Sequence, residues 1–184
     1  MSRRTTLEDE LEDRLGLKAG TLDHLKAEQS DWARVIKSHA IVEATLNVRL
    51  ARRFPDLAEI VTRLPFDHGT YGKLTLLDQV GWLTPHELRL LRVLHELRSV
   101  LVHDVSYLDF DLEETTERWT AEKRKRLVDV VFESWQASNK LRLNEEWTEA
   151  HKANPAFMVT SAAWRFVMDT DELLLREGRA ALRP

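Results

Sequence analysis

The segment from Thr84 to about His103 carries the pattern that most restricts how this chain can fold. Thr84 can cap a helix, Pro85 suits its first turn, and Glu87 stands three residues after the cap, where it completes a capping box. At about 100° per residue, the apolar side chains that follow fall in one arc. They are Leu90, Val93, Leu94, Leu97, Val100 and Leu101. The segment therefore predicts an amphipathic helix with a broad core face.

A second apolar strip runs along the same predicted helix and contains an arginine. Arg98 lies between Leu91 and Val102 on the helical wheel. A face exposed only to water would not need these two apolar side chains. We therefore expect another helix to pack on the strip, and that helix could come from a second copy of the chain.

His103 is the other candidate for chemistry on this helix. Its spacing from Arg98 puts the two side chains about 140° apart around the helix axis. One copy of the pair would therefore make a loose site, which a second copy related by a dimer axis could close. The structural alternative is an arginine paired with a carboxylate, and a histidine at the negative end of the helix dipole.

The rest of the chain has helical rather than strand-like spacing of its apolar residues. Residues 1–20 are polar, which predicts a mobile N-terminal arm or a short helix. Residues 21–105 are expected to form the core, and residues 106–184 to add C-terminal helices that pack on it. The predicted class is an all-α helical bundle. Its further helices span about Leu22 to Arg53, Tyr71 to Val80, Thr120 to Ala137 and Ala156 to Arg176, with a turn near Leu57–Leu64 and a linker over Asp109–Glu117.

Composition and charge restrict the classes of function. The 184 residues include no cysteine, which excludes disulfides, thiol nucleophiles and cysteine zinc sites. No stretch is apolar enough for a membrane span, the N-terminus has no signal core, and we expect a cytoplasmic protein. A net charge of −4 and the lack of a basic recognition helix argue against direct DNA binding.

The basic run Lys123–Arg126 predicts a solvated helix face. Trp82, Trp119 and Trp135 are expected in the core or at an interface.

Three segments, taken in order, resemble the mannitol operon repressor family, also called MltR. They are IVEATLNVRLARRF at 41–54, GTYGKLTLLDQVGWLTPHELRLL at 69–91 and LHELRSVLVHD at 94–104. Within the last segment, the span from Arg98 to Asp104 is similar to the Arg-x4-His-Asp element of HEPN-type helical domains. The resemblance covers about residues 30–105 and implies a HEPN-like helical bundle.

The resemblance implies two alternatives for function. A protein like the mannitol operon repressors would be a transcriptional-regulatory or protein-interaction protein without catalysis. It would form a homodimer and act through a protein partner. A HEPN-type protein would instead bind RNA and cleave it without a metal ion, and could be the toxin of a toxin–antitoxin pair. Whether the chain is an enzyme stays open at this point.

In the HEPN alternative, four residues would form the active site. His103 would act as general base or acid. Arg98 would stabilise the negative charge on the phosphorus-centred transition state, and Glu43 would orient Arg98. Ser99 would hydrogen-bond His103 or the phosphate. Catalytic members usually have an amide or an acidic residue where this chain has Ser99, which favours the non-catalytic alternative.

We expect neither a cofactor nor a metal ion. His39 and Glu43 stand four residues apart on one predicted helix, but two ligands are too few for a stable metal site. The run Gly69–Lys73 lacks the spacing of a phosphate-binding loop. It is better explained as a helix start that Thr70 caps, where Lys73 could face an anion at the positive end of the helix.

Overall fold

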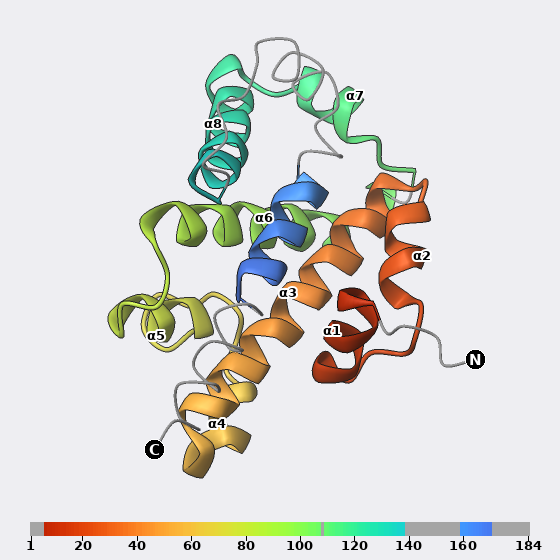
Figure 1. The fold of residues 1–184 in the computed structure, drawn as a ribbon. Coiled ribbons are helices and arrows are strands. Elements are labelled where there is room, and N and C mark those ends of the chain that lie inside the picture. Colours follow the sequence, from red (N-terminus) through yellow and green to blue (C-terminus); the bar gives the residue numbers. More distant parts are fainter. Residues whose placement is uncertain (1–5, 108, 139–158, 171–184) are drawn as a thin grey trace, which may run out of the picture.

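The computed structural model describes residues 6–107, 109–138 and 159–170, and this part of the chain is helical throughout, with no β-strand. Figure 1 shows the arrangement of its elements. They are α1 (Leu7–Leu15), α2 (Thr21–Ala27), α3 (Asp31–Arg53), η1 (Pro55–Leu57), α4 (Ala58–Thr62), α5 (Lys73–Gln79), α6 (Pro85–His103), η2 (Val105–Tyr107), α7 (Leu112–Glu117), α8 (Ala121–Ser138) and a helical segment over 159–170. The predicted all-α helical bundle is confirmed. Within these residues, no helix is long and apolar enough to cross a lipid bilayer.

Two long helices organise the fold. The helix α3 runs through the molecule, and α6 packs across it (Figure 1). Helices α1, α2 and α4 also pack on α3, whereas α8 packs on α6. Apolar side chains from all these helices form one core, to which the 159–170 segment contributes Val159, Phe166 and Val167. The helix α6 therefore lies between α3 on one side and α8 on the other.

The predicted start of α6 is confirmed in detail. Thr84 accepts the backbone N–H of Glu87, and the Glu87 carboxylate accepts the backbone N–H of Thr84, so the capping box is complete. Most of the expected core face is buried as well. Val100 is the exception, because it lies at the edge of that face and is 49% exposed. The prediction of a core position for Val100 is wrong.

Within residues 1–20, Leu7–Leu15 form a packed helix, so this stretch is not the mobile arm that the sequence predicted as one alternative. Thr6 forms a capping box with Asp9 at the start of α1, and Gly16 ends the helix with a φ of 67°. Leu11 is 1% exposed in the core. The buried Glu12 carboxylate accepts the backbone N–H groups of Gly20 at 2.7 Å and Leu22 at 2.7 Å, which ties α1 to the start of α2.

The single helix predicted from about Leu22 to Arg53 is two helices. The chain leaves helical geometry after α2, and Ser30 then caps α3 by accepting the backbone N–H of Ala33. The Glu28 carboxylate accepts the backbone N–H groups of Gln29 and Ser30, and these bonds stabilise the non-helical segment between α2 and α3. The predicted end is confirmed, since α3 stops at Arg53, just before Phe54 and Pro55.

Two further starts differ from prediction. The N-cap of α5 is Gly72, without a side-chain cap, so the expected capping by Thr70 is wrong. A Cβ on Gly72 would lie 2.3 Å from the backbone nitrogen of His68, so only glycine fits there. The predicted linker Asp109–Glu117 contains α7, because Asp111 caps it and the Leu112 side chain is buried. The Trp135 side chain and the ends of the helix predicted over Ala156 to Arg176 lie outside the described residues.

Candidate functional site

Polar side chains gather where α3, α5 and α6 meet. His39 and Glu43 come from α3, Lys73 from the first position of α5, and His95 and Arg98 from α6. Two of the four residues proposed for a HEPN-type site, Glu43 and Arg98, therefore belong to this polar cluster. The charges of both residues act on the pKa of His39, Glu43 raising it and Arg98 lowering it.

A buried ion pair forms one half of the polar cluster. The Lys73 side chain is 2% exposed, and its Nζ lies 2.5 Å from the Glu43 Oε1 atom. Gly72 lies close against the backbone of Asp67 and His68 in the loop before α5, and Lys73, the first residue of that helix, reaches Glu43 of α3. A buried ammonium needs a counter-charge, because its desolvation is otherwise uncompensated. Glu43 supplies that charge.

A pair of histidines forms the other half. The Nε2 atom of His39 lies 3.1 Å from the Nδ1 atom of His95, and the ring of Phe66 contacts both imidazoles, with centroids 4.3 Å and 5.1 Å away. Burial lowers the pKa of His39 to about 4, and the His95 and Arg98 charges act in the same direction. Burial also lowers the pKa of His95. At neutral pH both rings are therefore uncharged, and one donates its N–H to the other.

Arg98 is half-buried beside these histidines. Its charge lowers the pKa of both imidazoles. The expected bond from Glu43 to Arg98 is not made, because Glu43 is paired with Lys73 instead. Among the described residues no carboxylate forms an ion pair with Arg98. The carboxylate-paired arginine of the structural alternative is therefore absent from this part of the chain.

Neither Ser99 nor His103 is bonded to a member of the polar cluster within the described residues. Ser99 directly follows Arg98 on α6 and is half-buried. His103 is exposed at the last position of α6. No hydrogen bond or ion pair within the described ranges joins His103 to Arg98 or to Ser99. The four residues of the HEPN alternative are thus split, with Glu43 and Arg98 in the cluster and Ser99 and His103 outside it.

The second apolar strip of α6 has a partner inside the chain. Leu91 is fully buried, and His95, on the same side, meets His39 of α3. Farther along, the Nε1 of Trp32 in α3 donates to the backbone carbonyl of Leu101 at 3.2 Å. Val102, at the end of the strip, is 44% exposed. The expected docking helix is therefore α3 along most of the strip, and only the end stays open.

Three members of the cluster were missed as site residues. The sequence neighbours of His39, His95 and Lys73 give no sign that these side chains meet. His39 and His95 are 56 positions apart, and Glu43 and Lys73 are 30 apart. In the part of the chain that the structure describes, no three histidine or acidic residues could hold a metal ion together.

The chain was compared with models of known families, with curated proteins and with solved structures, and none of them matches it.

Proposed function

We propose that the chain is a non-catalytic regulatory or protein-interaction protein. The observation that carries this proposal is the pairing of Glu43 with the buried Lys73. It satisfies the carboxylate that a HEPN-type site would use to orient Arg98. The resemblance to the mannitol operon repressor family leads to the same expectation of a regulator without chemistry of its own.

The geometry of α6 supports this proposal. RNA cleavage by a general acid or base needs the imidazole within hydrogen-bond reach of the ribose hydroxyl, while the guanidinium contacts the same phosphate. His103 is exposed at the end of α6, whereas Arg98 is half-buried on the same helix and acts electrostatically on both His39 and His95. Both of those histidines have a lowered pKa and hydrogen-bond each other. A neutral pair whose members hydrogen-bond each other stabilises the helix crossing, and neither His39 nor His95 is then free to act as a base on a substrate.

An RNA cleavage assay tests the proposal. The wild type, His103→Ala and the control His86→Ala, which alters a histidine at the other end of α6, are incubated with single-stranded and structured RNA. We expect the same background level of cleavage from all three proteins. Cleavage by the wild type and by His86→Ala that disappears in His103→Ala would overturn the proposal.

A homodimer is the assembly that we propose for this regulator. Val102 is 44% exposed at the open end of the second apolar strip of α6, where an apolar contact between two copies would cover it. Light scattering is expected to give twice the mass of one chain. A monomer at micromolar concentration would contradict the dimer. We also infer that the protein acts in the cytoplasm through a protein partner rather than on DNA directly, in keeping with its net charge of −4.

One observation keeps the HEPN-type ribonuclease as the second candidate. Arg98 has no carboxylate ion pair within the described residues, and His103 is exposed, so a second copy could bring the two groups together. In that case cleavage requires the dimer. Val102→Glu, which places a charge at the open end of the strip, would then abolish both dimer and activity together.

A further inference from the structure

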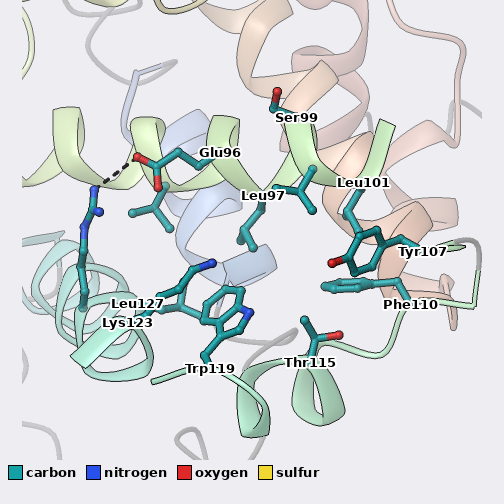
Figure 2. Close-up of a pocket in the computed structure, with 13 residues that line it drawn as sticks. Glu96, Leu97, Ser99, Leu101, Tyr107, Phe110, Thr115, Trp119, Lys123 and Leu127 are labelled. Carbon is teal, nitrogen blue, oxygen red and sulfur yellow. Dashed lines mark hydrogen bonds and ion pairs between the residues drawn. The ribbon is translucent and has the colours of Figure 1, made fainter. Parts of the chain in front are cut away.

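A cleft of about 480 Å³ lies on the side of α6 opposite the polar cluster. Figure 2 shows it between α6 and the segment that runs through η2, α7 and α8. Its lining is mainly apolar and includes Leu97, Tyr107, Phe110, Trp119 and Leu127. This volume falls within the roughly 300–1,000 Å³ typical of small-molecule sites, which combine apolar walls with a few polar groups.

Within the described residues, one cation at the cleft has no acidic partner. The Nζ of Lys123 lies 4.1 Å from the centroid of the Trp119 ring, and Figure 2 shows the two side chains next to each other. No carboxylate in the described ranges pairs with it. The ammonium is therefore held by the face of an indole and keeps its charge available. Arg126, the other cation of the lining, is bonded to Glu96 at 3.3 Å.

The aromatic end of the cleft lies away from the ion pair. Tyr107 and Phe110 contact each other edge to face, with centroids 6.1 Å apart. They lie toward the C-terminal end of α6, whereas Glu96 lies toward the middle of that helix (Figure 2). Between the two ends, Leu97 and Trp119 face each other beside Lys123. The cleft therefore combines a mainly apolar surface with the positive charge of Lys123 at its edge.

We propose that this cleft binds a small organic acid that joins one carboxylate to an aromatic or branched apolar body. The carboxylate pairs with Lys123, and the body lies between Leu97 and the aromatic rings. A single negative charge fits better than a phosphate dianion, because only one of the two cations lacks a partner. The apolar body supplies most of the binding free energy through buried area. This inference does not depend on whether the chain is catalytic.

The test uses naphthylacetate and its neutral analogue naphthylacetamide, titrated by calorimetry into the full chain. We expect naphthylacetate to bind one to one with a dissociation constant below about 1 mM. The amide keeps the apolar body but lacks the charge, so we expect it to bind about fivefold more weakly, the upper range for one exposed ion pair. No saturable heat with either compound, or equal affinities for both, would overturn the proposal.

Two variants locate the ligand. Lys123→Gln should reduce the affinity for naphthylacetate to that for the amide. The matched control is Lys125→Gln, which alters a lysine that is also exposed on α8 but does not line the cleft. This control should leave both affinities unchanged. Val100→Phe places a larger side chain at the half-exposed rim and should weaken both ligands. Circular dichroism melting checks that each variant is folded. Unchanged naphthylacetate binding in folded Lys123→Gln, or in folded Val100→Phe, would contradict the assignment.

Discussion

The two sides of α6 use charge in opposite ways. On the α3 side, the buried Lys73 ammonium pairs with Glu43, and His39 and His95 share one hydrogen bond. On the α8 side, a cleft lies between α6 and α8, and Lys123 lies on an aromatic ring with no acidic partner in the described residues. One helix therefore separates a largely buried ion pair and a bonded histidine pair from a cleft where one cation, Lys123, has no acidic partner among the described residues.

The comparison indicates which polar residues stabilise the fold and which are available to a ligand. A buried group that loses its partner costs the full desolvation of the group that remains, so the α3 side should be sensitive to substitution. An exposed pair is already hydrated and contributes little. The difference between the two sides should therefore appear as a difference in free energy of unfolding.

The largest effect is expected from breaking the buried pair. Glu43→Ala leaves the Lys73 ammonium without its counter-charge, and we expect a loss of about 3 kcal/mol in urea unfolding, at the lower end for a buried pair because Glu43 is 35% exposed. The double variant Glu43→Leu with Lys73→Met removes both charges and should recover most of that loss. If Glu43→Ala changed the free energy of unfolding by less than about 0.5 kcal/mol, the polar groups on the two sides of α6 would not differ in their contribution to stability.

The next effect is a pH dependence of the free energy of unfolding that arises from His39 on the α3 side. Because the pKa of His39 is lowered to about 4 in the folded chain, the unfolded chain binds more protons at mildly acidic pH. The contribution of neutral His39 to the free energy of unfolding is complete above about pH 6.5, the pKa of histidine in the unfolded chain. It falls as the pH drops toward the lower pKa of His39 in the folded chain. Between about pH 8 and about pH 5 the wild type should lose about 2 kcal/mol more than His39→Leu. Parallel curves for the two proteins would contradict this expectation.

A smaller effect tests the helix that both sides share. Thr84→Ala removes the hydroxyl that caps α6, and we expect a loss of about 1 kcal/mol in the free energy of unfolding. Glu87→Gln, which can still accept the backbone N–H of Thr84, should cost less. Equal losses in the two variants would indicate that charge at the start of α6, rather than the hydroxyl cap, stabilises the helix.

The smallest effect is expected on the α8 side. Glu96→Gln breaks an ion pair whose side chains are 61% and 58% exposed, and the expected change is about 0.5 kcal/mol or less. The same urea unfolding experiment measures it beside Glu43→Ala. A loss as large as that of Glu43→Ala would remove the contrast between the two ion pairs.

Local signals in the sequence predicted much of the fold. The Thr84–Glu87 capping box and the Phe54–Pro55 stop each act within one turn of helix, so a single stretch of sequence contains all the information. The break before Ser30 was missed, although Ser30 and Asp31 form an ordinary helix start. The apolar residues around the break keep helical spacing, and that periodicity obscured the start signal.

The candidate site was only partly predictable, because its contacts join distant segments. Glu43 and Arg98 were identified through the resemblance, but their surroundings depend on how α6 packs on α3 and α5 packs on α6. The helical pattern of α6 placed Arg98 in a second strip without indicating that α3 would cover most of it. Amphipathic spacing shows which face is buried, but the residue on the other side of the contact comes from tertiary packing.

A titration of the imidazole signals by nuclear magnetic resonance most directly tests the claim that the α3 side is a closed structural cluster. Spectra are recorded from about pH 8 down to the onset of unfolding, and His39→Leu assigns the His39 signal. The account predicts that His39 stays neutral until the pH approaches its lowered pKa of about 4. A His39 signal that titrates near the unperturbed value of about 6.5 would show an open, hydrated imidazole and contradict the account.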